Sequence, residues 1–151
     1  MVAEYNDWVI DSGATKHICG NRNSFFEYTL VREGEEFIFL GDSRSTPVLG
    51  KGKVLLKLTS GKTLSLSNVL HVPEILYNLR SVFVLGKAGV KVSFEDDKIV
   101  MNKNGVFVGK GYCSRELFKL SLMKMFLLLL IFIVLLILLT PLIYGMEGLV
   151  M

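Results

Sequence analysis

The sequence predicts an all-β fold with one short helix, followed by a hydrophobic segment near the C-terminal end. Short runs rich in β-branched and aromatic residues recur through the first 120 residues, and turns containing Gly, Asn or Asp separate them. In the clearest of these runs, apolar and polar residues alternate. The sequence lacks the alternation of strands and helices that is typical of a parallel sheet. Together these observations favour a compact β-barrel or sandwich.

Seven runs account for the expected strands and one for the helix: the strands are Tyr5–Ile10, Glu36–Leu40, Lys53–Thr59, Thr63–Leu70, Val90–Phe94, Lys98–Met101 and Val106–Lys110, and the helix is Leu79–Lys87. Val54, Leu56 and Leu58 recur at every second position of the third run, which predicts a half-buried strand. The turn Ser60-Gly61-Lys62 is expected to join that strand to the next, and Asn104-Gly105 predicts a second hairpin.

Charge and metal-ligating residues exclude two classes of function. The chain carries 17 Lys and Arg against 14 Asp and Glu, a net charge of +3, without the clustered basic stripe of a nucleic-acid-binding domain. His17, Cys19, His71 and Cys113 are scattered and form no Cys-x-x-Cys pair, so a zinc module is not expected. The sequence therefore predicts no nucleic-acid partner, no metal and no cofactor.

Residues 122–146 form a hydrophobic, transmembrane-like segment with no charge between Met125 and Met146. As a helix this stretch would cross a hydrocarbon core of roughly 30 Å. The basic residue Lys124 would lie on the cytoplasmic side, which predicts a single-pass membrane protein whose N-terminal domain is cytoplasmic. The alternative is a read-through of non-coding sequence, because every residue from Met125 to Leu139 has uracil as its middle codon base. In that case the protein is expected to be cytoplasmic.

The motif Asp11-Ser12-Gly13-Ala14 is the strongest candidate for a functional site. It follows the apolar run Trp8-Val9-Ile10, so it places a carboxylate at the end of a buried strand. A charge that leaves water must find partners, and the small residues after it allow a tight turn that brings backbone N–H groups near. An ordinary structural turn is the competing interpretation, since Asp-Ser-Gly is common in loops.

Further blocks accompany this motif: His17-Ile18-Cys19-Gly20-Asn21, Phe25-Phe26, the stretch from Leu66 to Glu74, and Asn78-Leu79-Arg80-Ser81-Val82. Together with Asp11-Ser12-Gly13-Ala14 they resemble the protease region of Copia-type LTR-retrotransposon Gag-Pol polyproteins, over about residues 5–120. The resemblance implies a retropepsin-like closed β-barrel, and it suggests that the chain is a truncated copy of a longer polyprotein. Arg80 and Phe83 depart from it, because Leu and Gly are expected there.

The resemblance implies an aspartic endopeptidase that cleaves a Gag-Pol precursor. Such enzymes need two carboxylates that share a proton, and the sequence has no second Asp-Ser/Thr-Gly. A working enzyme is therefore expected to be a homodimer with one Asp11 from each subunit. Ser12 would bond across the two-fold axis, Gly13 would let the backbone approach the carboxylates, and Ala14 would be small because the loops crowd there.

A flap over the substrate is also implied by the resemblance. Its expected tip is Gly41-Asp42-Ser43-Arg44-Ser45, between the strand Glu36–Leu40 and a strand after Pro47. It would close over an extended polypeptide, as in strand addition. A plain surface hairpin is the competing interpretation.

Two other functions are compatible with the sequence. One is a catalytically degenerate β-barrel that folds without cleaving anything. The other is an interaction module that the segment 122–146 anchors to a membrane.

Overall fold

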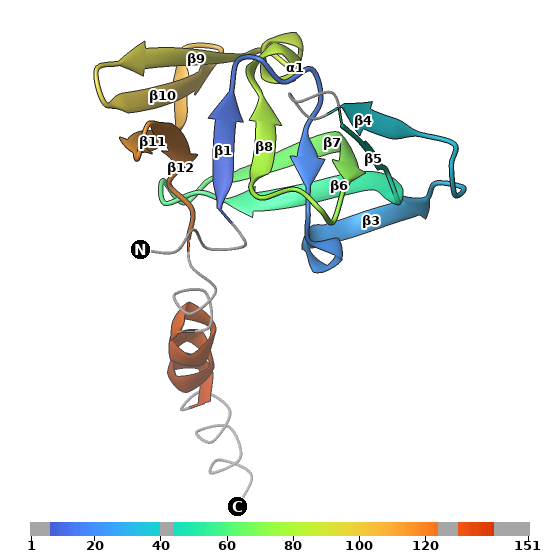
Figure 1. Ribbon diagram of the computed structural model, residues 1–151. Coiled ribbons are helices and arrows are strands. Elements are labelled where there is room, and N and C mark those ends of the chain that lie inside the picture. The colour runs from blue at the N-terminus through green and yellow to red at the C-terminus, as the bar shows by residue number, and fades with distance from the viewer. Residues whose placement is uncertain (1–6, 40–43, 124–129, 141–151) are drawn as a thin grey trace, which may run out of the picture.

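The computed structural model describes residues 7–39, 44–123 and 130–140. These residues form one ten-stranded sheet, a separate two-stranded sheet and little helix (Figure 1). In chain order the elements are β1 (Trp8–Asp11), β2 (Ile18–Cys19), the 3-10 helix η1 (Arg22–Ser24), β3 (Phe25–Leu30), β4 (Phe37–Phe39), β5 (Ser45–Pro47), β6 (Gly50–Lys57), β7 (Thr63–His71), β8 (Asn78–Ser81), α1 (Val82–Lys87), β9 (Val90–Glu95), β10 (Lys98–Lys103), β11 (Val106–Ser114) and β12 (Leu117–Leu120). The expectation of a mostly-β protein is confirmed.

The large sheet runs in the order β3-β6-β7-β2-β8-β1-β12-β11-β10-β9. Most neighbours are antiparallel, but two pairs are parallel: β1 with β8, and β2 with β7. These parallel pairs join the N-terminal strands to strands some 50 or more residues later, and they place β1 near the middle of the sheet. Figure 1 shows β1 and β8 side by side, with α1 at the end of both. This arrangement brings the end of β1 to the start of the helix.

Local sequence explains the hairpins. Asn104 and Gly105 have φ of 53° and 75°, the left-handed values that a tight two-residue turn between β10 and β11 requires. Gly61, with φ of 87°, lies in the turn between β6 and β7, where its N–H donates to the carbonyl of Leu58 at 2.9 Å. Both hairpins predicted from the sequence are confirmed.

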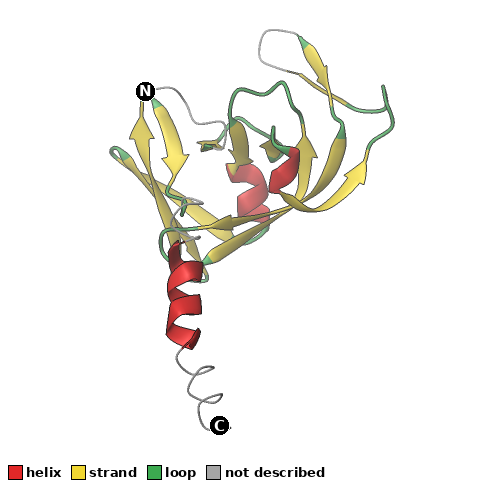
Figure 2. Ribbon diagram, turned by 90° about the horizontal axis from the view of Figure 1, so that it is seen from below, coloured by secondary structure: helices red, strands yellow, loops and turns green. Residues whose placement is uncertain are grey.

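Alternation along the strands divides the buried side chains into two clusters on opposite faces. Cys19 and Val69 belong to the larger cluster, while their chain neighbours Ile18 and Leu70 belong to the smaller one. This follows because successive side chains of a strand point to opposite faces. Ile38 of β4 packs against the smaller cluster, so the β4–β5 hairpin is rooted there. The strands β4 and β5 extend away from the large sheet (Figure 2).

The closed barrel expected from the resemblance needs correction. In the described part of the chain the strand order is open, with β3 and β9 at its two ends. A single isolated bridge, Leu58 with Leu122, joins the β6–β7 turn to the segment after β12. The N–H of Thr59 donates to the Ser121 carbonyl at 3.1 Å, and the N–H of Met123 donates to the Lys57 carbonyl at 2.8 Å. Only this short segment pairs with the turn, and it is too short to form a ladder of hydrogen bonds that would close the sheet.

Two further expectations are corrected. The helix predicted at Leu79–Lys87 is shorter, because its first residues extend β8 and the helix begins at Val82. Tertiary pairing decides this: Leu79 lies in register with Val9 of β1, so an extended backbone gains a full set of ladder bonds. The flap's second strand, expected after Pro47, instead ends there.

In the C-terminal segment, residues 130–140 are helical and carry exposed aliphatic side chains. The hydrophobic segment was expected to be helical from residue 122, but Leu122 takes part in the β-bridge with Leu58. Lys124, its expected cytoplasmic end, lies outside the described residues. Within the described ranges, no helix has both the length and the apolar character needed to cross a membrane.

Candidate functional site

Strand β1 carries Asp11 from the protein interior to its surface. Trp8, Val9 and Ile10 are 2%, 4% and 5% exposed, and Asp11 at the strand's end is partly exposed. The strand lies between β8 and β12, so its backbone is bonded on both sides. The buried apolar run therefore fixes the position of the carboxylate while water still reaches it.

The turn after β1 holds that carboxylate. The N–H of Gly13 donates to Asp11 Oδ1 at 2.7 Å, a short bond typical of a charged acceptor. A Cβ at Gly13 would lie 3.3 Å from the same oxygen, closer than most such contacts, so a larger residue would press on the carboxylate. Ser12 and Gly13 are exposed, and Ala14 is half-buried. The tight turn expected from the sequence is present, and its small residues Ser12 and Gly13 are exposed to solvent.

Ser81, which the sequence did not suggest as a site residue, ties this loop to the sheet. It lies in register with Asp11 across the parallel pair β1–β8. Its Oγ donates to the carbonyl of Ala14 at 2.6 Å, and its backbone N–H donates to Nδ1 of His17 at 3.1 Å. The same Oγ accepts the N–H of Val84 at 3.2 Å, which caps α1. One side chain thus contacts both the loop and the helix.

Asn78 holds the chain at the other side of β2. Its Oδ1 accepts the N–H of Gly20 at 2.8 Å. Asn78 and Ser81 are the first and fourth residues of the block Asn78-Leu79-Arg80-Ser81-Val82, which helped to carry the resemblance. The structure gives this block a physical role, because Asn78 and Ser81 fix the segment that runs from Asp11 to Gly20. The presence of Ser81 in this block was the sequence feature that could have identified it as a site residue.

His17 is buried behind the loop. It is 3% exposed, and burial, with the charge of Arg80, lowers its pKa to about 4. The ring is therefore neutral near pH 7, which suits a nitrogen that accepts a hydrogen bond from Ser81. His17 also lines a hollow of about 320 Å³ between β7 and α1, whose other lining residues are Leu64, Ser65, Leu66, Ser67, Asn68, Val84, Leu85, Lys87, Ala88, Val90 and Lys103.

Arg80 points the other way from Ser81 and is fully buried. It lies in register with Ile10, a residue of the larger apolar cluster. Its three guanidinium nitrogens have no hydrogen-bond partner among the described residues. Burial lowers its pKa to about 9. The departure from the resemblance at this position therefore places a charge inside the core.

The hairpin β4–β5 is the expected flap. Its strands pair from Phe37 with Pro47 to Phe39 with Ser45. Of the predicted tip, Gly41, Asp42 and Ser43 lie outside the described residues, Arg44 is exposed, and Ser45 belongs to β5.

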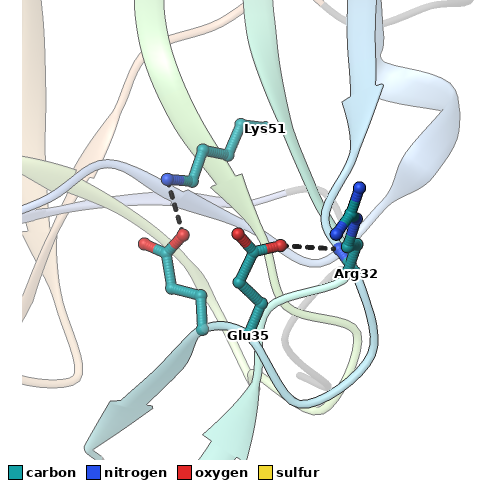
Figure 3. A network of polar contacts seen from close by, with 4 residues as sticks. Arg32, Glu35 and Lys51 are labelled. Carbon is teal, nitrogen blue, oxygen red and sulfur yellow. Dashed lines mark hydrogen bonds and ion pairs between the residues drawn. The ribbon is translucent and has the colours of Figure 1, made fainter.

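The root of this hairpin is held by polar contacts. Lys51 of β6 pairs with Glu36 at 2.5 Å, and Glu35 Oε2 accepts the backbone N–H of Arg32 at 3.3 Å (Figure 3). The N–H of Val48 donates to the Glu36 carbonyl at 2.9 Å. The strands are therefore anchored where they leave the body of the protein.

The cysteine and histidine residues do not gather. Cys19 is fully buried, and burial raises the pKa of its thiol, whereas Cys113 is exposed. His71 Nδ1 bonds to the hydroxyl of Tyr28 at 2.7 Å, beside Phe25. In the part of the chain that the structure describes, no group of three potential ligands is placed to hold a metal ion.

Chemically, one chain offers one carboxylate on an exposed, small-residue turn. The other candidate aspartates lie elsewhere: Asp96 and Asp97 form the turn between β9 and β10, and Asp42 lies outside the described residues. None of the described aspartates comes from a second Asp-Ser/Thr-Gly turn. A carboxylate pair at Asp11 therefore requires a second copy of the loop.

A family model described as the Pol polyprotein β-barrel domain matches residues 8–90 of the chain. This range includes the Asp11 loop, the β4–β5 hairpin and Ser81. No solved structure matches the chain.

Among curated proteins, the chain is 28% identical to a retrovirus-related Pol polyprotein from transposon TNT 1-94 of Nicotiana tabacum, over 76% of the chain and 8% of that protein. It is 37% identical to the retrovirus-related Pol polyprotein from transposon RE1 of Arabidopsis thaliana, over 59% of the chain and 6% of that protein. The RE2 polyprotein of the same plant is 36% identical over 53% of the chain and 5% of its own length. The chain thus spans less than a tenth of these relatives.

Proposed function

The chain belongs to the family of Pol polyprotein β-barrel domains, and we propose that it is the aspartic endopeptidase domain of a Copia-type retrotransposon polyprotein, active as a homodimer. The observation that carries this proposal is the Asp11 turn. A buried strand delivers a carboxylate to the surface, and a backbone N–H at 2.7 Å holds it among small residues.

In the proposed mechanism, the Asp11 carboxylates of two chains meet and share one proton. The ionised carboxylate takes a proton from water, which attacks the carbonyl carbon of the scissile peptide bond. The protonated carboxylate polarises the carbonyl oxygen. The exposure of Ser12 and Gly13 in one chain supports this, since both are open to the partner's loop.

The proposed substrate is an extended segment of the Gag-Pol precursor. The β4–β5 hairpin would close over it as a flap, with backbone hydrogen bonds supplying affinity. Its support is the anchored root at Glu36 and Lys51, from which the paired strands β4 and β5 extend.

The test is cleavage of precursor-derived peptides by wild type and by Asp11→Asn. Asn keeps the side chain's shape but neither accepts the proton of water nor shares one, and in a dimer the change removes both carboxylates. Cleavage is expected in mild acid for wild type and is expected to vanish in the variant, while sedimentation shows the same dimer. Equal cleavage by both proteins would refute the mechanism.

A degenerate barrel is the second candidate, and Arg80 favours it. A buried guanidinium that finds no partner among the described residues destabilises the core that positions β1 and β8. A wild-type chain that stays monomeric and inert at every pH, yet folds, would support this candidate over the protease.

We further propose that the charge-free stretch 125–146 holds the domain at a membrane. The absence of charged residues between Met125 and Met146 and the exposed aliphatic side chains of residues 130–140 support this. The tagged chain should resist carbonate extraction from membranes, and a variant that lacks residues 125–151 should be released. Release of both would count against the anchor.

A further inference from the structure

The loop that carries Asp11 is held from behind by two buried residues. Ser81 is fully buried and His17 is 3% exposed. Ser81 Oγ donates to the Ala14 carbonyl at 2.6 Å, and Ser81 N–H donates to His17 Nδ1 at 3.1 Å. These bonds link residues more than 60 positions apart, and together they close both ends of the loop against the end of β8.

The position of Ser81 makes this contact specific to the candidate site. Ser81 lies directly across the parallel strands from Asp11, and its hydroxyl also caps α1 through the N–H of Val84. Asp11 is therefore fixed from two sides: by the pairing of β1 with β8, and by the bonds that hold Ala14 and His17. A shift of Ser81 would move the carboxylate relative to the sheet.

The bond to His17 works only while Nδ1 is unprotonated. An imidazole nitrogen that accepts a hydrogen bond carries its lone pair toward the donor. Once protonated, Nδ1 becomes a donor and meets the Ser81 N–H, another donor. The charges near the ring are cationic: Arg80 on β8 acts on it electrostatically, and Lys87 on α1 and Lys103 on β10 line the same hollow. No carboxylate lines the same hollow, so a positive charge on the ring has no compensating partner there.

We propose that Ser81 and His17 are positioning residues for the Asp11 loop, and that protonation of His17 releases the loop. The mechanistic meaning of this inference rests on the proposed protease function, since a positioned carboxylate matters most if it reacts. Burial and the nearby Arg80 lower the pKa of His17 to about 4, so release is expected only near pH 4 and below. We call the hydrogen bonds of Ser81 to Ala14 and His17 the clamp. The clamp sets the lowest pH at which the Asp11 loop is held in place.

The first experiment measures loop order in the full chain by amide hydrogen exchange and NMR order parameters of Ser12, Gly13 and Ala14. Ser81→Ala removes the hydroxyl and is expected to speed exchange in these residues at least tenfold at pH 6. Ser121→Ala is the matched control, because Ser121 is also buried but its hydroxyl has no hydrogen-bond partner among the described residues. An ordered loop in Ser81→Ala, with exchange equal to the control, would overturn the clamp.

The second experiment follows loop order against pH in the Asp11→Asn background, so that titration of Asp11 does not contribute. Loop order should fall with a midpoint near pH 4 in this background. Adding His17→Asn, whose Oδ1 takes the place of Nδ1 but does not titrate, should shift the loss to lower pH. If both proteins lose order at the same pH, His17 is not the switch.

A measurement without any substitution of His17 guards against a variant that does not fold. The ¹⁵N shift of Nδ1 in wild type should be that of an unprotonated acceptor at pH 6 and should change together with the exchange rates of the loop. A protonated Nδ1 at pH 6 would refute the proposed bond.

Failure of the clamp and failure of the protease are distinguishable. A chain that cleaves no peptide but releases its loop through Ser81 and His17 retains the clamp and loses the enzyme. A chain that cleaves with an acid limb unchanged by Ser81→Ala and by His17→Asn retains the enzyme and loses the clamp.

Discussion

Arg80 and Ser81 are neighbours on β8 and both are fully buried, but they differ in hydrogen bonding. Ser81 faces the Asp11 loop, where its hydroxyl and its N–H make hydrogen bonds of 2.6 to 3.2 Å. Arg80 faces the apolar cluster, where its guanidinium finds no partner among the described residues. Strand alternation separates the two side chains onto opposite faces.

The difference shows what decides the cost of a buried polar group. A donor that leaves water costs little if the fold offers an acceptor, and it costs several kcal/mol if the fold offers none. On one face of β8 the polar residue organises the candidate site. On the other face a charged residue weakens the core on which that site rests.

The largest expected effect is a gain of stability when Arg80 is replaced. Arg80→Leu removes an uncompensated buried charge, and we expect the free energy of unfolding to rise by about 3 kcal/mol. Urea unfolding at pH 7 measures the change. Lys98→Met removes a positive charge from an exposed position on β10 and serves as control, with an expected change within about 0.5 kcal/mol. No gain in Arg80→Leu would mean that the guanidinium is compensated.

The second effect is on the pH dependence of stability. The folded-state pKa of His17 is lowered from 6.5 to about 4, so the unfolded chain binds a proton first as the pH falls. Stability should decrease between pH 6.5 and about 4, by up to roughly 3 kcal/mol from this residue, and its contribution should be constant below that range.

The comparison of wild type with His17→Asn isolates this contribution from that of the carboxyl groups. The decline in unfolding free energy from pH 7 to pH 4 should be shallower in the variant. Parallel curves for the two proteins would contradict the lowered pKa of His17.

A smaller effect is expected from removing the Ser81 hydroxyl. Ser81→Ala leaves the Ala14 carbonyl and the Val84 N–H without a partner, which should cost about 2 kcal/mol. Ser121→Ala removes a hydroxyl that has no partner among the described residues and should be close to neutral. Thermal unfolding of both variants gives the difference. Equal losses would show that burial, rather than bonding, sets the effect.

The smallest effect concerns the end of the domain. The backbone N–H of Ser121 donates to the Lys110 carbonyl at 2.9 Å, and Leu122 packs against the larger cluster. A chain that ends at residue 123 should therefore be more stable than one that ends at residue 120, by about 1–2 kcal/mol. The range of about residues 5–120 that the resemblance covers would then leave out residues that stabilise the fold. Identical melting temperatures would place the boundary at residue 120.

Sequence patterns predicted the strands that carry their own signals. The hairpins at Ser60-Gly61-Lys62 and Asn104-Gly105 follow from turn chemistry, and the strand that contains Val54 follows from alternation. The strands β2, β3, β8 and β12 were missed. β2 has only two residues, and β8 looked like the first turn of a helix. Both β2 and β8 pair with strands 50 or more residues away in the chain, and local propensity carries no information on such pairing.

The residues of the candidate site likewise fall into those that the sequence could predict and those that it could not. Asp11, Gly13 and their turn could be predicted, because the apolar strand and the small residues are contiguous. The roles of His17 and Ser81 could not, because their bond joins residues 64 positions apart. The charge of Arg80 was visible as a departure from the resemblance, but its burial depends on the register of β8 with β1.

The most direct test of the catalytic role of Asp11 is peptide cleavage by Arg80→Leu and by Arg80→Leu combined with Asp11→Asn. Arg80→Leu removes the buried charge from the core, so any inactivity that comes from instability disappears. Both proteins are brought to the same dimer concentration, and cleavage of precursor-derived peptides is followed in mild acid. We expect cleavage by the single variant and none by the double variant. A folded, dimeric Arg80→Leu protein that cleaves nothing, or equal cleavage by both proteins, would contradict the proposed role of Asp11.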